Sequence, residues 1–318
     1  MRASAHETVA ASASLRALLA GLSPEARRPL RVAADIPVAR QRFDVMVAAA
    51  LNTPERTAAL EHVACHEYRD DGVPRLQLTP PSPVRGAIMH IHGGGWCLGS
   101  ARTLAPALAR LALDTNTCVV SIDYRLAPEH PHPAALEDCH RASRAILTRL
   151  AAEHALKPDQ VLLAGESAGA HLALLTLPGL RDEGIALAGV MLTYGLFDLS
   201  NTRPSRTRAD GLPLLDGDTC GFFTRTFLGD HDTMDSSVSP WLLSSSELAG
   251  LPPALFAVGT LDPLFDDSVG MHQHWLVAGN TSHLIEYETA PHAFDLWPIP
   301  EAEHLAQAQC QFIAAHMA

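Results

Sequence analysis

From about residue 61 onward, short apolar runs of strand length alternate with longer stretches of helical periodicity. The apolar runs are nearly continuous, so strands formed by them need cover on both faces of a sheet. Strands that alternate with helices in this way typically form a mostly parallel sheet. The sequence therefore predicts an α/β fold with helices on both faces. The expected strands lie near residues 62–69, 75–79, 84–92, 117–123, 160–165, 188–195, 254–259 and 282–288, and the expected helices near 101–114, 134–154, 167–177, 267–278 and 303–317.

Two segments depart from this alternation. Residues 1–60 show helical periodicity without a strand pattern, and a second helical stretch within them covers about 38–50. Residues from about 197 to 239 are rich in turn-forming and charged residues, and they are expected to form an insertion at the carboxyl edge of the sheet. This insertion contains an apolar group made of Phe222, Phe223 and Phe227.

Composition excludes several classes of protein. Of the 318 residues, 47% are hydrophobic and 18% are charged, which is enough apolar material for a core and excludes a disordered chain. The formal net charge is -12 without a basic patch, so neither a nucleic acid nor a membrane is expected as a partner. No apolar run approaches the ~18 residues of a membrane span and no secretory pattern is present, so a cytoplasmic location is expected. Six scattered cysteines predict reduced thiols, and neither a metal nor an organic cofactor is expected.

The pentapeptide Gly165-Glu166-Ser167-Ala168-Gly169 follows an apolar run and precedes a helical stretch. A serine in such a sharp strand-to-helix turn has a strained backbone, and side chains two residues before and after it would collide. This explains both glycines. The turn raises the hydroxyl group above the sheet at the positive end of the helix. Ser167 is therefore the candidate nucleophile.

A serine nucleophile needs a base, and the order along the chain selects one. In the α/β-hydrolase arrangement that carries this turn, serine, acid and histidine follow in that order, each after the carboxyl end of a strand. Only one of the late histidines, His292, lies in a loop after an expected strand. The remaining late histidines fall in expected helices or at the start of a strand: His272, His274, His283, His304 and His316.

The candidate acid follows from the same rule. Asp262 comes directly after the apolar run 254–259. Asp266 and Asp267 are expected in the first turn of the next helix, where acids complement the helix dipole. Replacing either of them with asparagine is therefore expected to have only a mild effect on the reaction rate. Asp262 is therefore expected to orient His292 and stabilise its imidazolium form.

Three consecutive glycines follow the expected strand at 84–92. Without side chains, their backbone N–H groups can point into a cavity. The amides of Gly93 and Gly94, together with that of Ala168, are the candidate donors for a tetrahedral oxyanion.

These motifs resemble those of the hormone-sensitive lipase-like esterases, the bacterial family IV branch of the α/β-hydrolases. The resemblance covers about residues 61–318. It rests on HGGGW at 92–96, DYRLAPEHPHPAALED at 123–138, GESAG at 165–169, SP at 239–240, LPPALFAVGTLDPL at 251–264 and HAF at 292–294.

The resemblance implies an α/β-hydrolase fold with a helical cap. Residues 1–60 would form the N-terminal part of the cap, and 61–318 the catalytic domain with a cap insertion at about 200–235. Ser167, Asp262 and His292 would form the triad, and Gly93, Gly94 and Ala168 the oxyanion hole. Two residues depart from the family pattern, Glu166 before the serine and Ala170 after Gly169.

Two further expectations concern the surroundings of the site. Trp96, Phe222 and Phe223 are candidates for the substrate pocket, although the phenylalanines can equally pack the cap against the body. Glu129, in the proline-rich loop 124–133, is expected to pair with an arginine such as Arg125.

The expected function is a serine carboxylesterase that hydrolyses short- to medium-chain acyl esters through an acyl-enzyme. Its partner would be a small-molecule ester, and a homodimer is left open. An amidase, an arylformamidase or a lactonase with the same triad is the alternative. A ligand-binding receptor, resembling the plant gibberellin receptors, is disfavoured because such receptors lose the final histidine, which is present here as His292.

Overall fold

A computed structural model of the protein describes residues 4–21, 36–207 and 215–317. Within these residues one sheet has nine strands in the order β1-β9-β8-β7-β6-β4-β5-β3-β2. The pairings of β2 with β3 and of β3 with β5 are antiparallel, and all others are parallel. The predicted α/β fold with a mostly parallel sheet is confirmed. The strands are β1 Ala5–Val9, β2 Ala64–Tyr68, β3 Arg75–Thr79, β4 Ala87–Ile91, β5 Cys118–Ile122, β6 Val161–Glu166, β7 Gly189–Thr193, β8 Ala254–Gly259 and β9 Ser282–Tyr287.

All eight strands expected after residue 61 are present. β4, β5, β7 and β8 are buried along their whole length, as continuous apolar runs on a sheet with two covered faces require. β2 and β3 form a hairpin in which Ala64 pairs with Thr79, and its turn contains Asp71 and Gly72.

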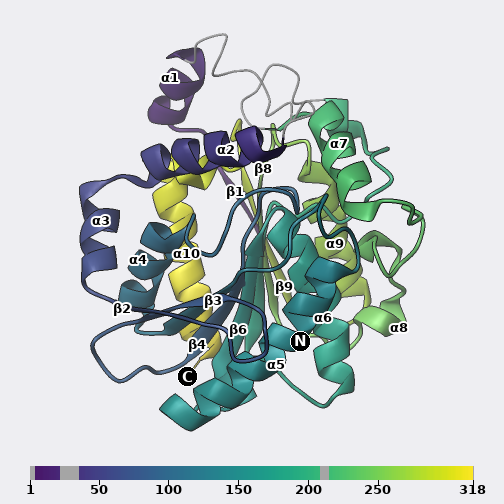
Figure 1. Ribbon diagram of the computed structural model, residues 1–318. Coiled ribbons are helices and arrows are strands. Elements are labelled where there is room, and N and C mark those ends of the chain that lie inside the picture. Colours follow the sequence, from purple (N-terminus) through teal and green to yellow (C-terminus); the bar gives the residue numbers. More distant parts are fainter. Residues whose placement is uncertain (1–3, 22–35, 208–214, 318) are drawn as a thin grey trace.

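Helices cover both faces of the sheet (Figure 1). α4 and α10 contact each other on one face, whereas α5 and α6 contact each other on the opposite face, where α9 packs on β8 and β9. The helices are α1 Ala13–Gly21, α2 Ile36–Leu51, α3 Pro54–Glu61, α4 Ala105–Thr115, α5 Ala134–His154, α6 Ala168–Asp182, α7 Gly217–Leu228, α8 Ser245–Leu248, α9 Phe265–Val277 and α10 Pro300–His316.

One strand lies where the sequence predicts none. Ala5–Val9 forms β1, an edge strand that runs parallel to β9 and pairs Ala5 with His283. Most of its side chains are exposed, so it has no apolar run that a pattern analysis could detect. The expectation of a purely helical segment at 1–60 is therefore wrong for these residues.

The two segments assigned to the cap meet at one end of the molecule. α1 and α2 of the N-terminal segment and α7 of the insertion all lie at the upper end in Figure 1. α3, by contrast, packs along α4 beside the sheet. Residues 22–35 and 208–214, which belong to these two segments, lie outside the described residues.

Candidate active site

Ser167 occupies the turn between β6 and α6 with φ 55° and ψ −121°. Few residues other than glycine adopt this backbone region without strain. A Cβ atom on Gly165 would lie 2.5 Å from backbone atoms of Gly169, and one on Gly169 would lie 1.9 Å from the carbonyl oxygen of Ile91. Both glycines are therefore sterically required, Gly165 by the turn itself, as the motif spacing predicts, and Gly169 by the end of β4.

Ser167, His292 and Asp262 form a hydrogen-bonded chain. Nδ1–H of His292 donates to Oδ2 of Asp262 at 2.8 Å, and the Ser167 hydroxyl group lies 3.0 Å from Nε2. Because a carboxylate only accepts, this assigns the proton to Nδ1 and leaves Nε2 free to accept from the serine. Asp262 is completely buried, and its Oδ1 accepts the N–H of Leu264 at 2.8 Å. The structure thus brings together the three side chains, although the serine and the histidine are 125 positions apart along the chain.

The loop that carries His292 is supported by two side chains that sequence analysis did not identify. The ring of Tyr194 packs edge-on against the imidazole at a centroid distance of 4.8 Å, and its hydroxyl group donates to Oδ1 of Asp295 at 2.7 Å. Arg56 of α3 donates to the carbonyl oxygens of Asp295 and Leu296, each at 3.1 Å. No periodic pattern marks such contacts between a loop and a distant helix.

The glycine-rich loop after β4, residues 92–97 and called the oxyanion loop below, differs from the expectation at one glycine. The N–H of Gly93 already donates to Oε1 of Glu166 at 2.6 Å. In the described part of the chain, the backbone N–H groups of Gly94, Gly95 and Ala168 have no hydrogen-bond acceptor. The available donors next to Ser167 are therefore those of Gly94, Gly95 and Ala168.

Glu166 connects the oxyanion loop to the sheet. Its Oε2 lies 2.8 Å from Nε2 of His90, and Nδ1 of the same ring lies 2.9 Å from the hydroxyl group of Ser121. His90 and Ser121 are buried. The carboxylate that departs from the family pattern thus holds Gly93 in place. Ala170, the other departure, is completely buried in the first turn of α6.

We expect Glu166→Ala to lower kcat about 10- to 100-fold with little change in KM. The substitution leaves the N–H of Gly93 unpaired, and a displacement of about 1 Å in a catalytic loop can cost about 100-fold in rate. Glu166→Gln is the matched control, because its amide oxygen can still accept from Gly93 and its NH₂ can donate to His90. Steady-state kinetics on one p-nitrophenyl ester checks both variants. A wild-type kcat for Glu166→Ala would show that the loop holds its shape without this carboxylate.

A cavity of about 1100 Å³ opens in front of Ser167 and His292. Trp96 and Phe223 line it, whereas Phe222 is not among its described lining residues. The ring of Phe223 lies against the oxyanion loop, since a Cβ atom on Gly95 would be 2.5 Å from it. α2 contributes a second wall through Phe43, Val47 and Leu51.

Trp96 also joins the insertion to the body. Its ring stacks on Phe227 of α7 at 4.5 Å, and its indole N–H donates to Nδ1 of His171 at 3.2 Å. Nε2 of His171 lies 2.7 Å from the carbonyl oxygen of Val238. Burial lowers the pKa of His171 to about 3, so the ring is neutral and can accept from Trp96 while it donates to Val238.

α2 is attached to the oxyanion loop through Arg40. Its Nε donates to the carbonyl oxygen of Cys97 at 2.7 Å, and its guanidinium pairs with Glu129 at 2.7 Å. The hydrogen bond from Arg40 lowers the pKa of Glu129 to about 2. Because this pKa lies below the ordinary value, the pair stabilises the folded protein at neutral pH, and its contribution is lost as the pH falls toward 2. The expected partner, Arg125, instead pairs with Asp138 at 2.8 Å.

The described residues show neither a metal centre nor a membrane span. They contain no group of three His, Cys, Asp or Glu side chains placed to hold a metal ion. No helix among 4–21, 36–207 and 215–317 combines the length and apolar character of a membrane span.

Comparison with known proteins identifies the family. Residues 88–296 match the model of a family described as alpha/beta hydrolase fold. The chain belongs to the α/β-hydrolase family. A crystal structure of an esterase from the bacterial hormone-sensitive lipase family superposes on this α/β hydrolase with a TM-score of 0.84 and 25% identity, over 97% of this chain and 100% of that chain. The predicted resemblance to hormone-sensitive lipase-like esterases is confirmed.

Curated relatives of this α/β hydrolase carry esterase names. Carboxylesterase NlhH of Mycobacterium tuberculosis is 33% identical over 210 residues, which are 65% of this chain and 66% of that protein. An acetyl esterase of Salmonella schwarzengrund is 32% identical over 203 residues, 62% of each chain. The matched region thus spans just under two thirds of these relatives. Their names agree with the predicted class of carboxylic ester hydrolase.

Proposed function

We propose that this α/β hydrolase is a serine carboxylesterase acting on small-molecule esters of short to medium acyl chain. The observation that carries the proposal is the chain of hydrogen bonds from Ser167 through His292 to Asp262, which faces a cavity beside unpaired backbone amides. The esterase names of the relatives support the class of bond.

In the proposed mechanism, Oγ of Ser167 attacks the ester carbonyl while Nε2 of His292 takes its proton. Asp262 stabilises the imidazolium, and the N–H groups of Gly94, Gly95 and Ala168 bind the oxyanion. The alcohol leaves with the proton from His292. Water then attacks the acyl-enzyme by the same steps and releases the acid.

Covalent labelling tests the nucleophile directly. A fluorophosphonate probe should label the wild-type protein at Ser167, located by mass spectrometry of peptides, and should not label Ser167→Ala. Labelling at a different serine would overturn the assignment.

We expect kcat/KM on p-nitrophenyl esters to be highest for acyl chains of about two to eight carbons. Each methylene that enters the apolar cavity contributes about 0.8 kcal/mol until the chain meets a wall, where strain removes the gain. Phe43 of α2 and Phe223 of α7 supply bulky groups at these walls. A series from acetate to palmitate, with emulsified triglyceride as a further substrate, measures this. A rate that rises steadily to sixteen carbons, or jumps at the oil–water interface, would favour a true lipase.

Phe223→Ala should shift this optimum toward longer or bulkier acyl groups, because it removes a ring from the cavity wall next to Gly95. Phe222→Ala is the matched control. The ring of Phe222 is next to Phe223 in sequence and is partly buried, but it lies outside the described lining of the cavity. The ratio of kcat/KM for octanoate to that for acetate measures the shift. An equal ratio in both variants would assign Phe223 to packing alone.

The cap is part of this proposal. α2 and α7 line the cavity, and α2 is attached to the oxyanion loop by Arg40. We propose that these two helices form the cap over a catalytic domain made of the residues from about 61 onward and the edge strand β1. An amidase, arylformamidase or lactonase would use the same residues, and matched ester and amide substrates distinguish them.

The cytoplasm remains the proposed location. A homodimer is the proposed alternative to a monomer, and size-exclusion chromatography with light scattering would distinguish these two oligomeric states.

A further inference from the structure

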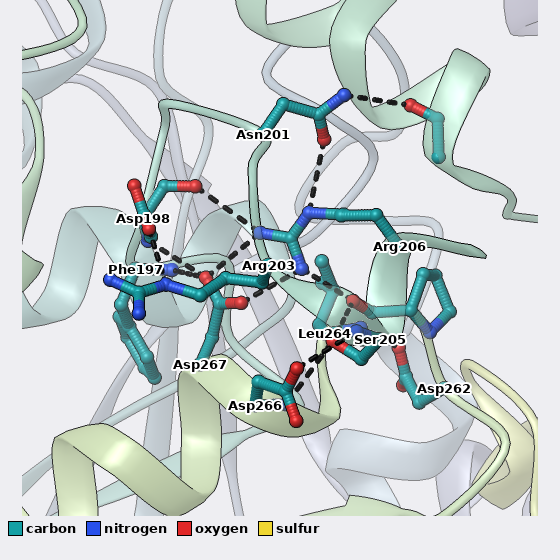
Figure 2. A network of polar contacts seen from close by, with 12 residues as sticks. Phe197, Asp198, Asn201, Arg203, Ser205, Arg206, Asp262, Leu264, Asp266 and Asp267 are labelled. Atoms are coloured by element: carbon teal, nitrogen blue, oxygen red, sulfur yellow. Dashed lines mark hydrogen bonds and ion pairs between the residues drawn. The ribbon is translucent and has the colours of Figure 1, made fainter. Parts of the chain in front are cut away.

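Arg206 and Asp267 form a charged pair that is buried between the insertion and α9. Arg206 is 4% exposed and Asp267 is completely buried. Nη1 lies 2.8 Å from Oδ2 of Asp267, and Nη2 donates to Oδ1 at 3.1 Å. Nε donates to Oδ1 of Asn201 at 3.0 Å, and Nη2 also donates to the carbonyl oxygen of Asp198 at 3.2 Å. Figure 2 shows the guanidinium at the centre of this network.

The same guanidinium reaches the loop of the proposed catalytic acid. Nη1 of Arg206 donates to the carbonyl oxygen of Pro263, which is the residue after Asp262. Ser205, from the same turn of the insertion, donates its hydroxyl group to this oxygen at 2.8 Å. The N–H of Ser205 also donates to Oδ2 of Asp266 at 2.8 Å. The insertion thus holds the chain directly after Asp262 from two adjacent residues (Figure 2).

Asp267 holds the other side of the insertion. Its Oδ1 accepts the N–H groups of Phe197 and Asp198, each at 2.7 Å. Burial is the largest single influence on Arg206 and lowers its pKa, but the charge of Asp267, the hydrogen bond to it and the further acidic groups nearby together outweigh burial and leave the pKa of Arg206 raised. The guanidinium is therefore charged at neutral pH. The mild effect of Asp267→Asn on the rate stays a prediction, but removing a completely buried carboxylate from beside this charge is expected to cost stability.

We propose that Arg206 is a positioning residue that fixes the loop carrying Asp262. The alignment of the triad then depends on how the insertion packs against this loop. This inference rests on the proposed function. The inference follows from the position of the Pro263 carbonyl group, because a rotation of the peptide group that contains it would move Asp262, the residue before Pro263. Asp262 in turn holds His292 through one hydrogen bond of 2.8 Å, so a small displacement reaches the imidazole directly.

The test uses a double variant, Arg206→Met with Asp267→Asn, in the full-length protein. It removes both charges together, which avoids an unpaired buried charge. The introduced asparagine would keep an oxygen that accepts from Phe197 and Asp198, so the start of the insertion stays anchored. Arg206→Lys is the conservative variant, because it can pair with Asp267 but lacks the planar fork that also reaches Pro263. Arg203→Met is the control: Arg203 lies in the same segment, pairs with Asp198 and stacks on Trp241 at 3.6 Å.

We expect the double variant to fold, with a Tm close to that of the wild type, and to lose about 10- to 100-fold in kcat with KM changed less than about threefold. Labelling of Ser167 by the fluorophosphonate should slow in parallel. Arg206→Lys should recover part of the lost kcat, and Arg203→Met should keep kcat within about twofold of the wild type.

Two results separate failure of this inference from failure of the proposed function. If the wild-type protein neither hydrolyses esters nor labels at Ser167, the proposed function is wrong. If the wild type is active and the folded double variant keeps a wild-type kcat, the pair only stabilises the fold and the inference is overturned. Should the double variant fail to fold, the kcat of Arg206→Lys decides: a wild-type value overturns the inference, and a reduced value at an unchanged KM supports it.

Discussion

Replacing Ser167 or His292 with alanine should lower kcat on a p-nitrophenyl ester by about four to six orders of magnitude, because members of a triad act as a unit. In the proposed mechanism, Ser167→Ala removes the attacking oxygen, and His292→Ala removes the group that lies 3.0 Å from it and would take its proton. The double variant should be scarcely slower than either single variant. Steady-state assays on purified protein, followed for long enough to detect slow turnover, measure this range.

His272→Ala is a suitable control for His292→Ala. His272 is also buried, and its ring lies 2.7 Å from the hydroxyl group of Ser282, away from the cavity. We expect this variant to lose stability but to keep kcat within about tenfold. Near-normal hydrolysis by His292→Ala, combined with a large loss in His272→Ala, would show that the base has been assigned to the wrong histidine.

Asp262→Asn should lower kcat by about four orders of magnitude with little change in the fold. The asparagine amide can donate to Nδ1 of His292, which would place the imidazole proton on Nε2 and remove the acceptor that Ser167 needs. The loss should therefore appear in kcat and in the rate of fluorophosphonate labelling. KM should change much less.

Asp138→Asn provides the matched comparison. Asp138 of α5 is another buried aspartate, but it pairs with Arg141 of the same helix and with Arg125 of the preceding loop instead of with a residue at the cavity. Its replacement should lower Tm while kcat stays within about tenfold of the wild type. Equal losses of kcat in the two variants would indicate that Asp262 acts through stability alone.

The strands and the positions of the candidate residues were predictable because local rules govern them. Continuous apolar runs require a sheet that is covered on both faces, and the parallel strands β6, β8 and β9 then end at one edge. Ser167, Asp262 and His292 follow those three strands, so a rule about strand ends was enough to bring them together. Gly165 follows from sterics within five residues, whereas Gly169 is required by the carbonyl oxygen of Ile91 at the end of β4.

Contacts that depend on one particular side-chain pair were not predictable in this way. The N–H of Gly93 is taken by Glu166 because the oxyanion loop passes directly over the end of β6, which no pattern within either motif reveals. Arg206 and Asp267 are 61 positions apart and lie in segments that look like ordinary polar turns and a helix start. β1 was not predicted because an edge strand with exposed side chains has no apolar pattern.

The pairing of β1 with β9 affects how a newly made chain reaches its final form. Residue 5 leaves the ribosome early, but its partner, residue 283, follows only after roughly tens of seconds at about 5–20 residues per second. Until then the emerging N-terminal strand has no sheet edge to join, and Arg56 has no His292 loop to hold. A nascent chain stopped before β9 is therefore expected to expose apolar surface of α2 that the finished protein turns inward. The substrate cavity can therefore close only after β9 and the His292 loop have been synthesised.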